Sequence, residues 1–242
     1  MPYRRLPNTD QARMRAIETA LEKGKRKSLT ELAFSQQSLE KLQFFYPRFS
    51  AAIRNLNAAK QNQFDKSKEY GDIFKRAKLY LSHFVQVLTF AIIREEIKPE
   101  VRKFYELDAD SQKIPVLNLE KDVIEWGEKI IKGEQKRCMN GGSPIYSPSI
   151  ALVKVHYESF IDAYRHQKML QNITNRASSQ MTTLRDEADA LIQHVWNEVE
   201  EKFSALPDDL KREKCTDYGV IYIYRPSELK KMQAEKYQIN LF

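Results

Sequence analysis

Cysteine, glycine and proline are scarce in this sequence of 242 residues, and each scarcity excludes a class of structure. The two cysteines, Cys138 and Cys215, lie far apart and form no Cys-x-x-Cys pair, which excludes a disulfide framework and a cysteine-rich zinc site. Seven glycines and nine prolines are too few for a collagen-like chain and argue against a sandwich or a barrel. Because so few cysteines fit a reducing compartment, we expect a cytoplasmic protein.

Long apolar segments are also missing. The basic residues at the N-terminus are not followed by the apolar run that a signal peptide needs. The most apolar window, residues 79–93, contains Ser82, His83, Gln86 and Thr89, so it is too short and too polar to span a bilayer. We therefore expect no membrane insertion and assign this window to a buried helix.

Sequence motifs for catalysis and for cofactor binding are absent. Neither glycine-rich phosphate motif occurs, nor does a Gly-x-Ser-x-Gly elbow, and no histidine has a glutamate three residues before it, as a di-iron bundle requires. We therefore expect no cofactor and no catalytic residues, and an enzyme is less favoured than a non-enzymatic protein. The weak metal candidates are His83, His194 and Glu198, of which the last two share one helix face.

The sequence is rich in apolar residues at helical spacing, three and four positions apart. One such stripe follows the Ser-x-x-Glu pattern at Ser28–Glu31, which predicts a capped helix start. Pro47 lies inside the stripe and should bend the helix without ending it. We expect long helices near 29–66, 72–97, 149–177 and 179–204, and shorter ones at 9–23 and 119–132. The predicted core is Leu42, Phe49, Ile53, Ala77, Leu81, Phe84, Leu88, Phe160, Ile192, Val195, Trp196 and Val199.

The predicted fold is all-α, an elongated antiparallel four-helix bundle built from two helical hairpins. Residues 1–28 form a basic N-terminal arm with a short helix, and residues 29–205 form the bundle. Within the bundle, hairpins 29–97 and 149–204 are joined by a connector at 98–148. Residues 206–242 form a C-terminal tail with a strand at 219–225 and a short final helix opening at Ser227.

The two hairpins resemble each other in sequence. A shift of 111 positions aligns residues 46–88 with 157–199 without a gap and pairs Ser67 with Ser178 and His83 with His194. This resemblance has two interpretations, a duplication about a pseudo-twofold axis or the similarity of any two amphipathic hairpins. His83 and His194 are accordingly either a paired imidazole site or two half-buried histidines with hydrogen-bonded rings.

Positive charge exceeds negative charge by seven, which permits an acidic partner. The N-terminal arm concentrates basic residues that could follow phosphates, although acidic residues interrupt them, so binding to nucleic acid would be non-specific. These residues are Arg4, Arg5, Arg13, Arg15, Lys23, Lys25, Arg26 and Lys27.

The tail contains the one convincing strand, residues 219–225, which is β-branched and aromatic. Its backbone needs a partner, for which the candidates are residues 144–146, residues 114–116, the N-terminal arm or another chain. Both faces are largely apolar, so we predict a paired strand that forms an interface. The candidate interface residues are Val220, Ile221, Tyr222, Ile223 and Tyr224.

The leading hypothesis is a non-enzymatic helical interaction or scaffold module that self-associates or binds another protein. It follows from the missing catalytic motifs, the long apolar stripes and a strand without an obvious partner. The alternative is a basic, largely non-specific nucleic-acid-binding protein that uses the N-terminal arm. A third hypothesis is an enzyme or a metal- or ligand-binding bundle without a recognisable motif.

Overall fold

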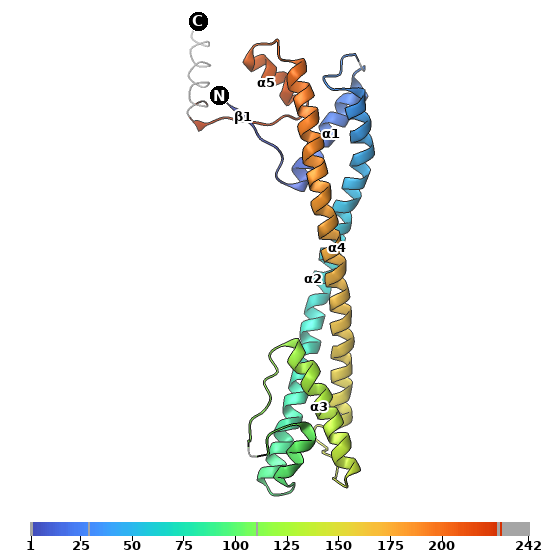
Figure 1. The fold of residues 1–242 in the computed structure, drawn as a ribbon, viewed down its shortest axis with the longest axis vertical. Helices are drawn as coiled ribbons and strands as arrows, with labels where there is room; N and C mark the ends of the chain where they lie inside the picture. Colours follow the sequence, from blue (N-terminus) through green and yellow to red (C-terminus); the bar gives the residue numbers. More distant parts are fainter. Residues whose placement is uncertain (1, 29, 110, 227, 229–242) are drawn as a thin grey trace. The chain divides into compact units, whose positions relative to one another are not determined.

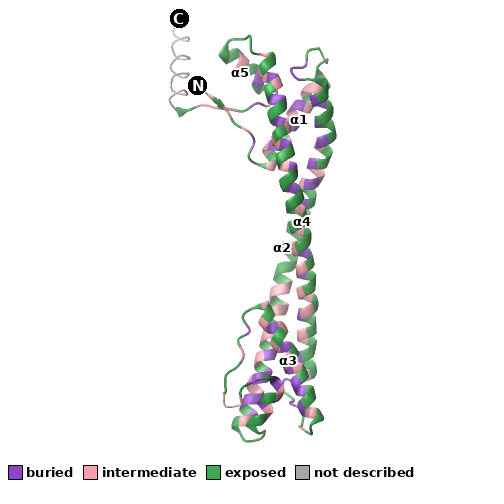
Figure 2. Ribbon diagram, in the orientation of Figure 1, coloured by how far each residue is buried: buried purple, intermediate pink, exposed green. Residues whose placement is uncertain are grey.

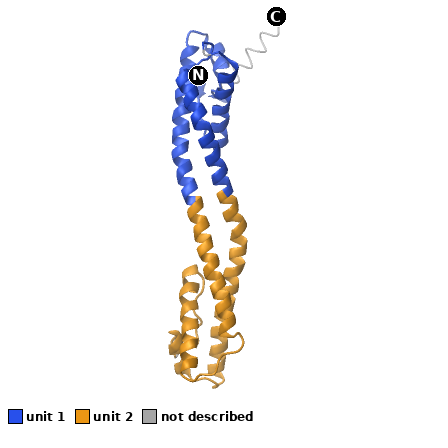
Figure 3. Cartoon of the chain, turned by 90° about the vertical axis from the view of Figure 1, so that its right-hand side faces the viewer, with its two compact units in different colours: residues 1–58, 175–242 blue, residues 59–174 orange. Residues whose placement is uncertain are grey.

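The computed structural model describes residues 2–28, 30–109, 111–226 and 228, and Figure 1 shows their fold. The chain forms two compact units (Figure 3), of which unit 1 comprises Met1–Ala58 with Asn175–Phe242 and unit 2 comprises Ala59–Thr174. The predicted all-α class is confirmed. In chain order the elements are β1 (Tyr3–Arg4), α1 (Asp10–Arg26), α2 (Gln36–Ile93), the 3-10 helix η1 (Pro99–Tyr105), α3 (Glu120–Met139), α4 (Ile150–Lys202), α5 (Asp208–Thr216) and β2 (Tyr222–Ile223).

The sequence predicted four long helices, but these segments form two continuous helices, α2 and α4. Helix α2 has 58 residues and α4 has 53, and they are antiparallel. The turns predicted around Gly71 and Ser178 are therefore wrong, because both residues lie inside helices. One helical glycine costs only about 1 kcal/mol, and a serine costs less, so packing of the flanking apolar residues outweighs it. Ser67 and Ser178, which supported a duplication as turn residues, both lie inside helices. The repeat itself stays a prediction.

Unit 1 buries its core between α1, the first part of α2, the last part of α4 and the segment after α5 (Figure 2). Ile17 of α1, Phe49 of α2 and Trp196 of α4 are almost fully buried in it. Helix α1 was expected at 9–23, and Thr9 caps its N-terminus by accepting a hydrogen bond from the Ala12 amide at 3.2 Å. Unit 1 therefore contains a third helix that packs against α2 and α4.

Unit 2 packs η1 and α3 against the other parts of α2 and α4. The sequence predicted that α3 ends at Gly133, but it continues to Met139. A Cβ at Gly133 would lie 2.7 Å from the Phe104 carbonyl oxygen and 2.6 Å from the Tyr105 ring. Gly133 is thus needed because η1 packs closely against α3 at this position, and it does not end the helix.

The predicted core is buried except for Ile53, which is partly buried. By contrast, the expected capping box at Ser28 does not start a helix. Helix α2 begins at Gln36, where Ser35 Oγ accepts a hydrogen bond from the Ser38 amide at 3.2 Å. The residues before it form a loop in which Leu32 and Phe34 are buried.

Of the predicted tail strand 219–225, Tyr222–Ile223 form a strand, whereas Gly219 lies in a turn. The partner of this short strand is the N-terminal arm. Strand β2 is antiparallel to β1, with Tyr3 opposite Ile223 and Arg4 opposite Tyr222. Helix α5 was missed within the predicted tail. The short helix predicted from Ser227 falls on residues outside those described. In the described part of the chain, no helix is long and apolar enough to cross a membrane.

Candidate functional site

The two histidines singled out by the sequence lie in different units. His83 is exposed on α2 in unit 2, and the His194 side chain is 55% exposed on α4 in unit 1. His194 Nε2 lies 3.7 Å from Glu198 Oε1. No group of three or more metal-binding side chains exists among the residues that the structure describes.

Glu198 instead holds the loop that precedes α2. Its Oε2 accepts a hydrogen bond from the Ser35 backbone amide at 3.3 Å. Burial raises the pKa of Glu198, but hydrogen bonds from Ser38 and Ser35 outweigh burial and leave the pKa below its ordinary value. The contacts of this carboxylate are therefore those of a structural group that fixes the start of α2.

The N-terminal arm is bound to α4 by two of its arginines. Arg4 Nη1 donates to Asn197 at 2.7 Å and to Glu200 at 2.9 Å. Arg13 is buried and pairs with Asp189, and the hydrogen bond to that carboxylate raises the pKa of the guanidinium. These two side chains therefore stabilise unit 1, which leaves less of the arm's positive charge for phosphates.

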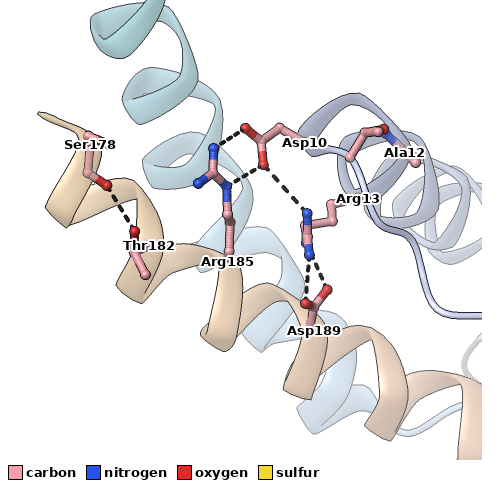
Figure 4. A network of polar contacts seen from close by, with 8 residues as sticks. Asp10, Ala12, Arg13, Ser178, Thr182, Arg185 and Asp189 are labelled. Carbon is pink, nitrogen blue, oxygen red and sulfur yellow. Dashed lines mark hydrogen bonds and ion pairs between the residues drawn. The ribbon is translucent and has the colours of Figure 1, made fainter. Parts of the chain in front are cut away.

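A second arginine–aspartate pair lies beside the first (Figure 4). Arg185 of α4 donates from Nε and Nη2 to Asp10 of α1, each at 2.7 Å. Arg13 Nη1 also lies 3.6 Å from Asp10. Each of the two helices therefore contributes one arginine and one aspartate to the ion pairs that join them.

The other basic residues of the arm are more exposed. Lys27 Nζ donates to the Tyr218 hydroxyl at 3.1 Å and lies over that ring together with Lys23. Arg26 forms a loose pair with Glu22 at 3.7 Å. The remaining three, Arg5, Arg15 and Lys25, are exposed.

The tail segment is only in part available as an interface. Val220 is 1% exposed in the core of unit 1, and the Ile221 carbonyl accepts a hydrogen bond from the Arg5 amide at 2.9 Å. The Tyr222 hydroxyl donates to Glu200 at 2.7 Å, and burial together with this bond raises the pKa of Tyr222. Of the segment, Ile221 is exposed, while Ile223 and Tyr224 are half-buried.

Unit 2 carries an exposed apolar face on α2 that the sequence reasoning missed. Its members are Phe64, Leu79, Phe90 and Ile93, with exposed fractions of 74%, 62%, 55% and 51%. At 3.6 residues per turn these positions fall within about 80° of one another around the helix. Their helical spacing could have revealed this α2 apolar face, but the stripe of the core on the same helix is stronger.

A similar face exists on α4 within unit 2. Val155, Met169 and Ile173 are 59%, 50% and 47% exposed. Their spacing places them within about 40° around the helix. We refer to these three residues as the α4 apolar face.

Unit 2 also contains a buried polar cluster that the sequence did not reveal. Glu134 and Arg137 on α3 form two hydrogen bonds of 2.7 Å, and the Tyr105 hydroxyl donates to Glu134. Arg137 Nη2 also donates to the Ser143 carbonyl at 2.6 Å, and the Ile145 amide donates to Glu134 at 3.2 Å. This cluster ties η1 and the loop after α3 to the helix.

The cluster fixes the protonation of its members. Burial raises the pKa of Glu134, but the hydrogen bonds from Arg137, Tyr105 and the backbone outweigh burial and lower it below its ordinary value. Burial and the bond to Glu134 raise the pKa of Tyr105. The carboxylate is therefore charged and the phenol neutral at pH near 7.

Comparisons with family models, curated proteins and solved structures found no match for this chain. The function is therefore inferred from exposed, paired and enclosed side chains.

Proposed function

We propose that this chain is a non-enzymatic helical interaction module that self-associates through unit 2. The observation that supports the proposal is the α2 apolar face. Single exposed apolar side chains are ordinary on a monomer, but a row of them on one helix is typical of a surface that binds another protein. Apolar side chains on one face of a helix are the anchors by which such a helix binds a groove on its partner.

A second copy of the chain is the partner that the charges favour. Lys68, Asp72 and Lys75 lie within the angular range of the α2 apolar face, which leaves one positive charge in excess. Lys75 Nζ lies 3.6 Å from Asp72 Oδ1, so Lys68 is the lysine that a contact between copies would use. Asp162 lies within the angular range of the α4 apolar face, with its Oδ1 3.6 Å from Arg165 Nη1. The α2 face of one copy can therefore meet the α4 face of another, apolar on apolar and lysine near aspartate. A twofold arrangement repeats this contact and covers both faces at once.

The tail strand does not support this proposal. Its strand partner is β1 of the same chain, so a strand without a partner no longer argues for a second chain. The apolar faces of unit 2 support self-association independently of the segment 219–225.

Nucleic-acid binding by the arm is the alternative, and the ion pairs of Arg4 and Arg13 weaken it. Its test is salt-dependent retention on DNA or RNA, measured with Lys23, Lys25, Arg26 and Lys27 changed to Gln. Retention that these changes abolish would favour the alternative.

The two cysteines are free, which supports a reducing, cytoplasmic location.

The experiment that tests self-association is sedimentation velocity over a range of concentrations, with the variant L79E/F90E. Both changes place a charge at an exposed helical position, so the variant should fold, and its association should weaken by at least about tenfold. The matched control is Phe44→Glu, which changes a 73% exposed phenylalanine on α2 in unit 1. An unaltered chain that stays monomeric, or equal weakening by the control, would contradict the proposal.

A further inference from the structure

Unit 2 contains a cavity of about 580 Å³ between the end of α2, η1, the end of α3 and the loop that follows α3. This volume is in the range of sites that hold small organic ligands. One side of the cavity is apolar and can accept a hydrocarbon chain or a ring. Its apolar lining includes Val87, Ala91, Ile97, Val101, Phe104 and Ile145.

Among the polar groups that line the cavity, the guanidinium of Arg137 is the buried one that the apolar side adjoins. Its side chain is only 4% exposed, and its Nε and Nη2 atoms are engaged by Glu134, Tyr105 and the Ser143 carbonyl. Tyr105 and Glu134 thus hold the guanidinium in a fixed orientation, so a ligand does not have to order it.

Arg137 Nη1 has no hydrogen-bond partner among the described residues. Within that part of the chain, the only enclosed side-chain nitrogen or oxygen atoms without a partner are Gln167 Oε1 and Arg212 Nε. Arg137 Nη1 is not one of these enclosed atoms, so it is accessible to solvent. Arg137 and Gly142 both line the cavity, and a Cβ at Gly142 would lie 2.7 Å from Nη1, which places the N–H groups of Nη1 at the cavity wall, within reach of a ligand.

Each of the two arginines that line the cavity is paired with a glutamate, Arg94 with Glu96 and Arg137 with Glu134, so their charges balance. The feature that favours an anion is Nη1 of Arg137, a donor without a partner among the described residues. Glu96 is the acidic residue that lines the cavity with the two arginines. Arg94 uses Nε and Nη2 to pair with Glu96, at 2.7 and 3.0 Å. Guanidinium groups bind carboxylates strongly because both partners of the hydrogen bond are charged.

We propose that this cavity binds a small carboxylic acid. The carboxylate accepts hydrogen bonds from Arg137 Nη1, and the apolar body of the acid packs against Val101 and Phe104. This inference is independent of self-association, since it depends on the cavity and not on the exposed faces of α2 and α4.

The test compares octanoate with octanamide as probes of the full chain, by titration calorimetry. The amide has the same apolar body without the charge, so octanoate should bind at least about tenfold more tightly. Equal affinities for the two probes, or no binding of octanoate at millimolar concentration, would overturn the proposal.

Two variants separate the carboxylate contact from the apolar contact. A Cβ at Gly142 would lie 2.7 Å from Arg137 Nη1, so Gly142→Ala should cover this nitrogen and abolish the preference for octanoate. Val101→Phe should fill the cavity and weaken both probes equally. Gly71→Ala is the control, because a Cβ there meets nothing within 4 Å.

Thermal unfolding shows whether each variant folds. A folded Gly142→Ala protein that keeps its preference for octanoate would refute the role of Nη1. If Gly142→Ala does not fold, Val101→Phe decides, because unchanged binding of octanoate in that variant would show that the acid does not occupy the cavity.

Discussion

Arg13 of α1 and Asp189 of α4 form a two-bond ion pair within unit 1, in which Nε and Nη2 lie 2.8 and 2.7 Å from the two carboxylate oxygens. Under the alternative hypothesis of nucleic-acid binding, the sequence made Arg13 a candidate phosphate contact, whereas the structure uses it to join two helices. A basic residue near the N-terminus was therefore not evidence of a free charge.

Arg13→Ala should destabilise unit 1. The change removes two charge-assisted hydrogen bonds, and the loss should be about 2 kcal/mol in the free energy of unfolding. Urea unfolding followed by circular dichroism measures it. The control is Arg15→Ala, an exposed neighbour on the same helix, which should change stability by less than about 0.5 kcal/mol. Equal effects of the two changes would show that the ion pair contributes nothing.

Two glycines inside helices of unit 2 should respond to alanine in opposite directions. A Cβ at Gly71 would meet no atom within 4 Å, so Gly71→Ala should stabilise the protein by about 0.5–1 kcal/mol through helix propensity. Gly133→Ala places its Cβ against the Phe104 backbone carbonyl, which cannot rotate away, and should cost about 1–3 kcal/mol. Thermal unfolding of both variants gives the two signs, and the same sign for both would be inconsistent with the close approach of η1.

These glycines also show what the sequence could not predict. Eleven of the twelve predicted core residues are buried. The apolar spacing identified these core positions because a stripe at helical spacing has only one side to bury. It could not decide whether Gly71 and Gly133 end a helix. That outcome depends on what packs against each residue, which is a contact distant in sequence.

The buried cluster was unpredictable for the same reason. Glu134 and Arg137 are three residues apart, as many exposed helix pairs are. Only the approach of Tyr105 and of the loop after α3 makes them buried. By contrast, the exposed α2 apolar face could have been found, because its spacing is present in the sequence.

Acid should weaken the Glu134–Arg137 pair. The pKa of Glu134 lies below its ordinary value of 4.5, so its contribution to stability is present above about pH 4.5 and is lost as the pH falls through the lowered pKa. At about pH 7, Glu134→Gln should cost about 3 kcal/mol, because it leaves a buried guanidinium without its carboxylate.

The difference between the unaltered chain and Glu134→Gln should therefore shrink from about pH 7 to about pH 3. Urea unfolding at several pH values measures this difference directly. Comparing the two proteins at each pH removes the contribution of other carboxylates, Glu198 among them. A difference that stays constant would show that folding does not lower the pKa of Glu134.

Alanine substitution of Ser28 and of Ser35 tests which of the two serines caps the start of α2. Ser35 accepts a hydrogen bond from the Ser38 amide, so Ser35→Ala should cost about 1 kcal/mol. Ser28, which the capping-box pattern selected, contacts Thr30 through its hydroxyl in an exposed loop, and Ser28→Ala should have almost no effect. Chemical unfolding of the two variants distinguishes them, and a larger loss for Ser28→Ala would restore the helix start predicted from the sequence.

Val220 and Ile221, two adjacent residues in the tail, should also differ in how much they contribute to stability. Val220 is 1% exposed and Ile221 is 42% exposed, although the sequence treated both as interface candidates. Val220→Ala removes buried methyl groups from the core of unit 1 and should cost about 2 kcal/mol, whereas Ile221→Ala should cost less than about 0.5 kcal/mol. Thermal unfolding measures both, and sedimentation velocity of the same samples tests association. If Ile221→Ala leaves stability unchanged but weakens association, the tail contributes to the interface in addition to unit 2. If neither quantity changes in Ile221→Ala, the strand serves only to hold the N-terminal arm on unit 1.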